Sequence, residues 1–392
     1  MTANLRDTYA VFPKWTQPFW TVLTGKPLRG EQPLIVPSGW TYLAVSLTVF
    51  AIGTAGSVVT VAAGSGWHLL ILLVTIPMTL MGSRLLILTI AHQGAHLRFC
   101  YSKRLNQLVH DCLTTIICSQ NYDSYRYDHF HVHHGIKTFG TLEDPVLSFI
   151  RQLGFDGDLS KPQLWRKLVL TCASPYFHGV YLFNRLRHNF VGGRIIRRCM
   201  ACVWWGSIIG LLAWCPHLIL PVVVGYGIPV LLLYNASAFL ELICEHVWMR
   251  PIADTDAFGH QRITELCWGR FCGEAVPAGE RYGAWIRWGV RMLFYHLPCR
   301  MLVLAGDAPQ HDFHHVVPNG WRWTVSAYER RDTIATGKME DREVWGLLEA
   351  IDIVFDNLST VRDHQSELKY LVVERKTGRP GKALAESMST GT

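Results

Sequence analysis

The chain has 392 residues, of which 49% are hydrophobic and only 17% are charged, a balance that is apolar for a soluble protein. Its formal net charge is +7. No motif interleaves basic and aromatic residues as in nucleic-acid-binding proteins, so anionic lipid headgroups are the better partner for this charge. The 11 cysteines stand at irregular spacings, which favours free thiols over a disulfide framework.

Residues 1–39 are predicted to form a cytoplasmic or interfacial segment. They are largely polar, with Trp15, Phe19 and Trp20 as aromatic anchors for a membrane surface. The opening residues, MTANLRDTYAVFPKW, contain no apolar core of the kind that a cleavable signal peptide needs.

Three apolar stretches follow that are long enough to cross a bilayer. Residues 40–66 carry no charge, and residues 67–91 carry only Arg84. Residues 199–240 run for 42 positions without a charge. A helix needs about 20 apolar residues to cross the hydrocarbon core, so the third stretch accommodates two spans. The sequence therefore predicts an all-α integral membrane protein with four spans arranged as two helical hairpins.

The basic residues predict the orientation of these hairpins. The hairpin tips, near 64–67 and 214–217, contain no Lys or Arg, whereas the flanking segments include RLRH at 185–188 and RIIRR at 194–198. Basic residues favour the cytoplasmic side. We therefore expect both hairpins to enter from the cytoplasm, with both termini inside, in a bacterial inner membrane.

The remaining segments are more polar and divide the rest of the chain. Helical periodicity at 106–119 and 163–184 predicts surface helices that cap a site, and AWIRWGVRMLFYHLPCRMLVLA (284–305) is suited to the membrane interface. A further helix is expected at 341–357. The predicted divisions are an N-terminal segment (1–39), a membrane domain (40–325), a cytoplasmic helical extension (326–375) and a disordered tail (376–392).

Four histidine motifs fall on the cytoplasmic side of this predicted topology. They are HQGAH (His92, His96), HFHVHH (His129, His131, His133, His134), EH (Glu245, His246) and HDFHH (His311, His314, His315). Residues four apart on a helix share a face, so His92 with His96 and His129 with His133 can each point at one centre. His131 falls opposite His129 and is expected in a supporting or surface position. The other nine imidazoles exceed the four ligands of a tetrahedral zinc site, which predicts two metals, and imidazole suits iron, zinc, copper or nickel.

Several charged residues near these motifs are candidates to orient the ligand imidazoles by hydrogen bonds. The carboxylates are Asp128, Glu143, Asp144, Glu245 and Asp312. Arg84 lies about two turns before His92, and it either pairs with such a carboxylate or extends its charge to the headgroups.

The order HxxxH, HxxxHH, EH and HxxHH, interleaved with two hydrophobic hairpins, resembles the integral-membrane fatty acid desaturase superfamily, which includes alkane monooxygenases and acyl hydroxylases. The resemblance extends over about residues 40–325. It implies a non-haem di-iron centre that uses O2 and is held by His92, His96, His129, His133, His134, His246, His311, His314 and His315. Phe130 stands where most acyl desaturases have a histidine, and the HxxxHH spacing is closer to the alkane monooxygenases, although FLELICEH lacks the Asn-Tyr typical of that branch.

The expected activity is desaturation of a fatty acyl chain. Hydroxylation of an alkyl or acyl chain and oxidative decarboxylation of a fatty acid to a terminal alkene are the alternatives, and a membrane metal carrier or sensor is the alternative outside the enzymes. A carrier would place ionisable residues inside the spans, and the two charge-free stretches, 40–66 and 199–240, contain no Asp, Glu, Lys or Arg. The sequence holds no rubredoxin-like pair of CxxC motifs and no GxGxxG, so the electrons are expected from a separate ferredoxin, rubredoxin or small cytochrome with its reductase.

Overall fold

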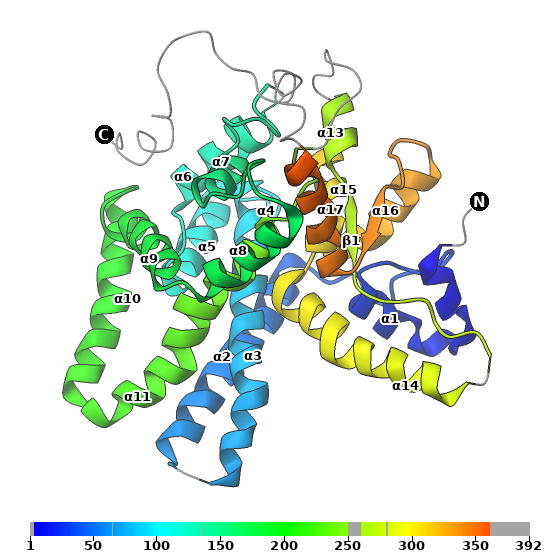
Figure 1. The fold of residues 1–392 in the computed structure, drawn as a ribbon. Coiled ribbons are helices and arrows are strands. Elements are labelled where there is room, and N and C mark those ends of the chain that lie inside the picture. The colour runs from blue at the N-terminus through cyan, green and yellow to red at the C-terminus, as the bar shows by residue number, and fades with distance from the viewer. Residues whose placement is uncertain (1–3, 65, 136, 250–259, 280, 361–392) are drawn as a thin grey trace.

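The computed structural model of the chain describes residues 4–64, 66–135, 137–249, 260–279 and 281–360. Four of its helices are long and apolar enough to cross a membrane, and they form two hairpins that project from the same side of the molecule (Figure 1). This confirms the predicted all-α membrane protein with four spans. The first hairpin consists of α2 (Gly39–Ala62) and a continuous helix built from η3 (Trp67–Ile71), α3 (Leu72–Arg84), η4 (Leu85–Ala91) and α4 (His92–Ala95).

The second hairpin has the same plan. Its first helix is α10 (Ile195–Trp214), and its second runs through η6 (Pro216–Leu218), α11 (Ile219–Val222), η7 (Val223–Leu233) and α12 (Tyr234–Leu242). In both hairpins the second helix contains a π-helical stretch, η4 or η7, just before the end that faces the rest of the protein. Such turns are rare in proteins and are frequent at functional sites.

Glycines allow the hairpin helices to approach closely. A Cβ atom on Gly82 would lie 2.6 Å from Cα of Phe50, and one on Gly53 would lie 2.4 Å from the backbone nitrogen of Thr79. Gly225 brings the second hairpin against α2, because a Cβ there would lie 2.9 Å from the backbone nitrogen of Val58. Small residues of this kind drive helix association in membranes, where lipid is as apolar as the side chains.

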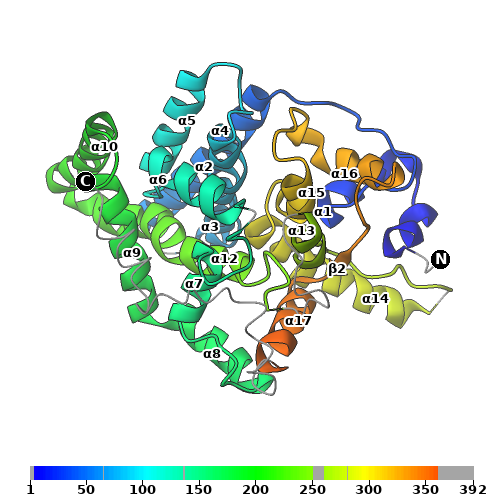
Figure 2. The same cartoon turned by 90° about the horizontal axis from the view of Figure 1, so that it is seen from above.

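Most of the helices outside the hairpins form a layer at one end of the spans, which we call the helical cap (Figures 1 and 2). Before the second hairpin it contains α5 (Lys103–Ile116), α6 (Tyr122–Tyr127), η5 (Asp128–His133), α7 (Pro145–Gln152), α8 (Lys161–Ala173) and α9 (Pro175–Phe190). After it come α13 (His260–Leu266), η10 (Ala308–Gln310), α15 (His311–Val316), η11 (Trp323–Val325), α16 (Ser326–Ala335) and α17 (Leu347–Thr360).

Two predicted helices differ in detail. The helix expected at 163–184 is two helices, α8 and α9, because Pro175 begins a new helix after the extended residue Ser174. The helix expected at 341–357 begins at Leu347, since β2 (Glu343–Trp345) first pairs in parallel with β1 (Gly269–Phe271). Gly346, at φ 104°, separates that strand from α17.

A hydrophobic core holds the cap together. Phe155, Phe177, Phe239 and Phe355 are all buried in one cluster, which joins the cap helices α8, α9 and α17 to the end of the second hairpin. The predicted boundary at 325/326 stays a prediction, and the tail expected at 376–392 lies outside the described residues. All 11 cysteines are free thiols.

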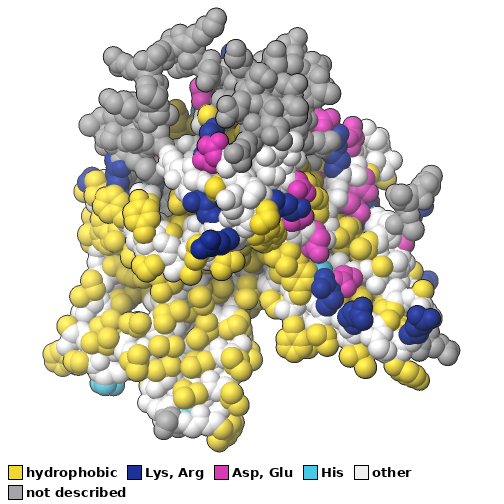
Figure 3. All heavy atoms as spheres, in the orientation of Figure 1, with side chains coloured by type: hydrophobic (Ala, Val, Ile, Leu, Met, Phe, Trp, Pro, Cys, Tyr) yellow, Lys and Arg dark blue, Asp and Glu magenta, His cyan; other side chains and the backbone are white. Residues whose placement is uncertain are grey.

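An apolar surface extends beyond the hairpins to the N-terminal segment. That segment contains η1 (Leu5–Val11), η2 (Lys14–Thr16) and α1 (Gln17–Thr24), and it packs beside α14 (Tyr282–Arg291), η8 (Met292–His296) and η9 (Cys299–Val303). This region has an apolar face, formed by the exposed side chains of Trp15, Phe19, Ile286 and Phe294. Figure 3 shows it as yellow patches beside the hairpins, with Lys and Arg above them.

Candidate metal centre

The first two histidines lie at the inner end of the first hairpin. The π-helical turn η4 ends at Ala91, and α4 then begins with His92 and is capped by His96; the two rings stack with centroids 4.9 Å apart. The Tyr125 hydroxyl lies 3.0 Å from Nδ1 of His92, so Nε2 of His92 is left to face the other histidines.

The HFHVHH motif forms a second π-helical turn, η5. Its spacing is visible in the backbone, because the N–H of His134 donates to the carbonyl of His129, five residues earlier, at 2.8 Å. This wider turn directs His129, His133 and His134 to the same side, which a regular α-helix would not. His131 points away: it is exposed and stacks on Tyr127.

The remaining four histidines come from the second half of the chain. His311, His314 and His315 are on the short helix α15, and His246 follows the end of the second hairpin. The backbone N–H of Val247 donates to the carbonyl of Leu266 at 2.8 Å, which fixes the loop that carries His246. Cys267 Sγ lies 3.4 Å from Nδ1 of His246, so the Nε2 atom again faces inward.

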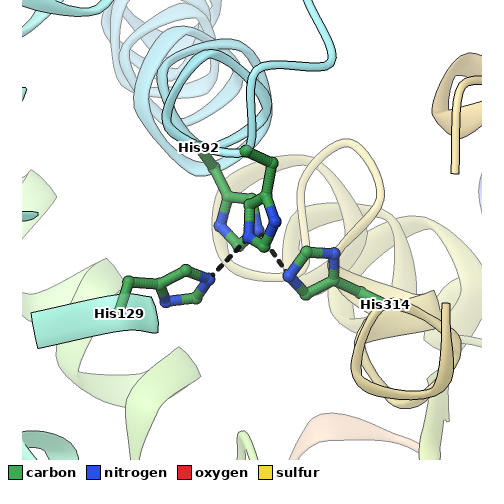
Figure 4. Close-up of side chains that lie close together, drawn as sticks. His92, His129 and His314 are labelled. Atoms are coloured by element: carbon green, nitrogen blue, oxygen red, sulfur yellow. Dashed lines mark hydrogen bonds between the residues drawn. The ribbon is translucent and has the colours of Figure 1, made fainter. Parts of the chain in front are cut away.

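These side chains form two adjacent groups. His92, His96, His129 and His314 make the first, and His133, His246, His311 and His315 make the second; within each, the four potential ligand atoms lie within 4.8 Å of one another. Figure 4 shows three rings of the first group, His92, His129 and His314, turned toward a common point from separate parts of the chain. Nε2 of His134 also belongs with the first group, at 3.0 Å from Nε2 of His129 and 3.2 Å from that of His314.

The electrostatics of the cluster suit a metal cation. Burial lowers the pKa of His96, His129, His134, His246, His314 and His315 well below the ordinary value, and burial lowers that of His311 to about 3. These rings are therefore neutral, and a neutral imidazole offers the lone pair that a metal requires. Neighbouring Nε2 atoms lie 2.9 to 3.3 Å apart. That matches the roughly 3 Å expected between donors at right angles, each about 2.1 Å from one metal.

The comparison with known families was decisive for the classification. A family model described as fatty acid desaturase matches residues 65–299, more than half of the chain. The chain belongs to the fatty acid desaturase family. No curated protein matches the sequence. Family membership supports an oxidoreductase of the membrane fatty acid desaturase type, and the histidine groups support a metal site. The match ends before α15, so it is the structure that brings the last three histidines to this site.

The predicted supporting carboxylates differ in what they contact. Asp144 is fully buried, and its Oδ2 lies 3.1 Å from Nδ1 of His133. Burial opposes a charge on His133, but this carboxylate raises the pKa of the ring to about 9. Asp144 also begins α7, since its Oδ1 accepts from the backbone N–H of Val146 at 2.9 Å. It thus fixes both a helix and an imidazole of the cluster.

The other candidates lie as follows. Glu245 Oε1 is 3.0 Å from Nε2 of His311. Asp312 binds Arg330 through both oxygens, at 2.9 and 3.0 Å from Nε, and so ties α15 to α16. Asp128 accepts from Gln120 at 2.6 Å, and Glu143 is exposed. The structure thus brings two of the five carboxylates to a ring of the histidine cluster.

Arg84 is buried and contacts both the backbone and a carboxylate. Its Nη2 donates to the carbonyl of Val303 at 3.2 Å and lies 3.9 Å from Oε2 of Glu241. Glu241 in turn binds Arg270 at 2.7 Å. The protein therefore has a buried ion network beside its histidines, as expected if Arg84 pairs rather than reaching the headgroups.

Sequence reasoning missed Tyr125, Cys267, Glu241 and Arg270. Tyr125 could have been found, because it precedes His129 by four residues and stacks on it at 5.2 Å. Cys267 contacts His246 from a distant part of the chain, and no local pattern marks it.

A pocket of about 200 Å³ lies beside the first histidine group. Gln93, Asp307, Phe313 and His314 line it, together with residues between Val317 and Glu329. Asp307 accepts hydrogen bonds from Thr89 at 2.9 Å and Gln93 at 3.0 Å, and burial raises its pKa. The pocket is smaller than the sites of about 300–1,000 Å³ that enclose drug-sized ligands, so it suits dioxygen or a small polar group.

Proposed function

We propose that this protein is a membrane-bound non-haem di-iron oxygenase that uses O2 and two electrons to desaturate a fatty acyl chain. The observation that carries the proposal is the pair of buried histidine groups at one end of four membrane spans. A di-iron centre there would be held by His92, His96, His129, His133, His134, His246, His311, His314 and His315. Membership of the fatty acid desaturase family supports the substrate class.

When bound, an iron pair supplies the oxidising power that removes hydrogen from an unactivated C–H bond. The protein supplies position and shielding. Asp144 and Tyr125 hold the outer nitrogens of His133 and His92, which fixes the direction of both rings. Burial of the cluster keeps bulk water away from the reacting chain.

Three outcomes are consistent with the same site, and they differ in atom balance. Desaturation removes two neighbouring hydrogens, and with two electrons and two protons O2 becomes two waters. Hydroxylation leaves one oxygen atom in the product and releases one water. Oxidative decarboxylation removes a β-hydrogen and releases the carboxyl group as CO2, which leaves a terminal alkene, and with two electrons and two protons O2 again becomes two waters. We place desaturation first, with the other two as alternatives.

The arrangement of the spans and the cap supports a lipid substrate and a separate electron donor. The acyl chain enters from the bilayer that surrounds the spans, and the cap lies on the cytoplasmic side, where Lys and Arg concentrate between hairpins and cap (Figure 3). A separate ferredoxin, rubredoxin or small cytochrome with its reductase delivers the electrons. An acidic donor of this kind would be attracted to a basic face.

The test is analysis of lipids from cells that express the protein together with an electron donor, grown under ¹⁸O2. New double bonds without ¹⁸O support desaturation, ¹⁸O in an alcohol indicates hydroxylation, and a terminal alkene one carbon shorter indicates decarboxylation. A variant with His133→Ala and His134→Ala is the inactive control. Identical lipids in both cultures, with metal bound to the parent, would overturn the enzyme in favour of a metal carrier or sensor.

A further inference from the structure

The two histidine groups differ in the number of imidazoles that they offer. With His134 included, five Nε2 atoms converge on the first group, whereas four from the described residues converge on the second. The second group has a further donor atom in the same place. Oε1 of Glu245 lies 3.0 Å from Nε2 of His311, and that nitrogen is itself 3.1 Å from Nε2 of His315.

The side of the ring on which Glu245 lies distinguishes a ligand from a supporting carboxylate. A supporting carboxylate contacts the outer nitrogen of an imidazole, as Asp144 contacts Nδ1 of His133. Glu245 instead contacts the inner nitrogen of His311, the atom that faces the other rings. The distance of 3.0 Å between Oε1 of Glu245 and Nε2 of His311 equals the distance between neighbouring imidazole nitrogens in the cluster. A carboxylate oxygen in that position is placed to share a metal with His311.

One oxygen of the buried Glu245 side chain has no partner in the part of the chain that the structure describes. The residue is 7% exposed, and its Oε2 has no hydrogen-bond partner among the described residues. The nearby guanidinium of Arg270 binds Glu241 at 2.7 Å instead. A buried carboxylate oxygen without a partner is costly, and a bound cation would remove that cost.

We propose that Glu245 is a direct carboxylate ligand of the second metal. Each metal then has five protein donors: five neutral imidazoles at the first, and four imidazoles with one carboxylate at the second. This inference rests on the proposed di-iron centre. The consequence is an inequivalent pair, because the anionic oxygen donor partly neutralises one metal and not the other.

The test is Mössbauer spectroscopy and iron titration of the full-length, detergent-purified protein loaded with ⁵⁷Fe(II). The wild type is expected to give two doublets of equal area. Glu245→Gln should lose or shift one doublet and weaken binding of one of the two irons at least about tenfold. Asp128→Asn is the matched control, since that carboxylate binds Gln120. An E245Q spectrum and affinity identical to those of the wild type would overturn the ligand role while leaving the di-iron centre intact.

A second measurement needs no variant. Infrared difference spectra of wild-type protein with ¹³C-labelled glutamate carboxylates, before and after iron loading, should show the bands of one glutamate shifting. No shift in a protein that binds two irons would overturn the inference. A wild type that binds no pair of metals would overturn both this inference and the proposed function.

Discussion

Asp144→Asn is predicted to weaken metal binding through a residue that contacts no metal. In the native protein Oδ1 of Asp144 accepts from the backbone N–H of Val146 at 2.9 Å, while Oδ2 lies 3.1 Å from Nδ1 of His133 and 3.3 Å from the backbone nitrogen of Gly140. Asparagine can keep the first bond, and it caps a helix as well as aspartate does. Its NH2 group would then face two N–H donors, so His133 loses its acceptor.

The size of the effect follows from these contacts. Loss of the partner that orients a ligand histidine typically lowers metal affinity about 10- to 100-fold, which corresponds to about 1.4–2.8 kcal/mol. The buried, unpaired amide donors also lower the free energy of unfolding, by about 1–3 kcal/mol. Because α7 keeps its cap, we expect the variant to fold.

The assay is a competition titration of iron against a chelator, on protein whose helical content is checked by circular dichroism. Asp128→Asn is the matched control, because Asp128 precedes His129 directly but binds Gln120. The D144N variant should bind iron about 10- to 100-fold more weakly, and D128N should bind as the wild type does. Equal affinities for D144N and wild type would refute the orienting role of Asp144, as would an equal loss in D128N.

Three further predictions concern the fold. Gly82→Ala should lower the free energy of unfolding in detergent by about 1–3 kcal/mol, because the added Cβ would lie 2.6 Å from Cα of Phe50. Gly210→Ala is the control, because open space surrounds that position, and it should be neutral or slightly stabilising. Equal melting temperatures for the two variants would contradict this packing. Arg330→Met leaves Asp312 buried without its partner. The free energy of unfolding, measured by denaturant titration, should fall by about 3–5 kcal/mol. An unchanged unfolding midpoint would argue against a stabilising pair. A photoreactive amino acid at Ile286 of α14 should cross-link to lipid in proteoliposomes, and one at exposed Lys338 should not; no lipid adduct at Ile286 would count against an interfacial α14.

Composition was sufficient to predict the spans because crossing a bilayer imposes a length and an apolar character on each helix. The four predicted spans agree with the structure to within a few residues. The cap was harder to predict. The break at Pro175 has a local signal that the helical periodicity obscured, whereas β2 depends on pairing with β1, more than 70 residues earlier in the chain.

The histidine motifs could be located from the sequence, but their grouping could not. Regular helical geometry places residues that are four apart on one face, and His92 and His96 are arranged in this way. The π-helical turn that brings His134 in line with His129 depends on its surroundings. Which motifs share a centre depends on how the two hairpins and α15 pack, because each group draws its rings from both halves of the chain.

Proximity in the chain was also a weak guide to the supporting residues. Asp128 and Asp312 adjoin histidines in the sequence but bind Gln120 and Arg330. Asp144 lies 11 residues from His133 and yet contacts it. A carboxylate next to a ligand on a helix points in a different direction from that ligand, so only the folded chain reveals which acid meets which ring.

The most direct test of the di-iron centre is metal content per chain, by elemental analysis of the detergent-purified protein. His133 and His134 belong to different groups, so changing both to Ala removes one ligand from each, and exposed His131→Ala is the matched control. The proposal predicts about two irons in the wild type and in H131A, and loss of iron from the double variant. Zinc alone, a single metal, or two irons that survive the double change would contradict it.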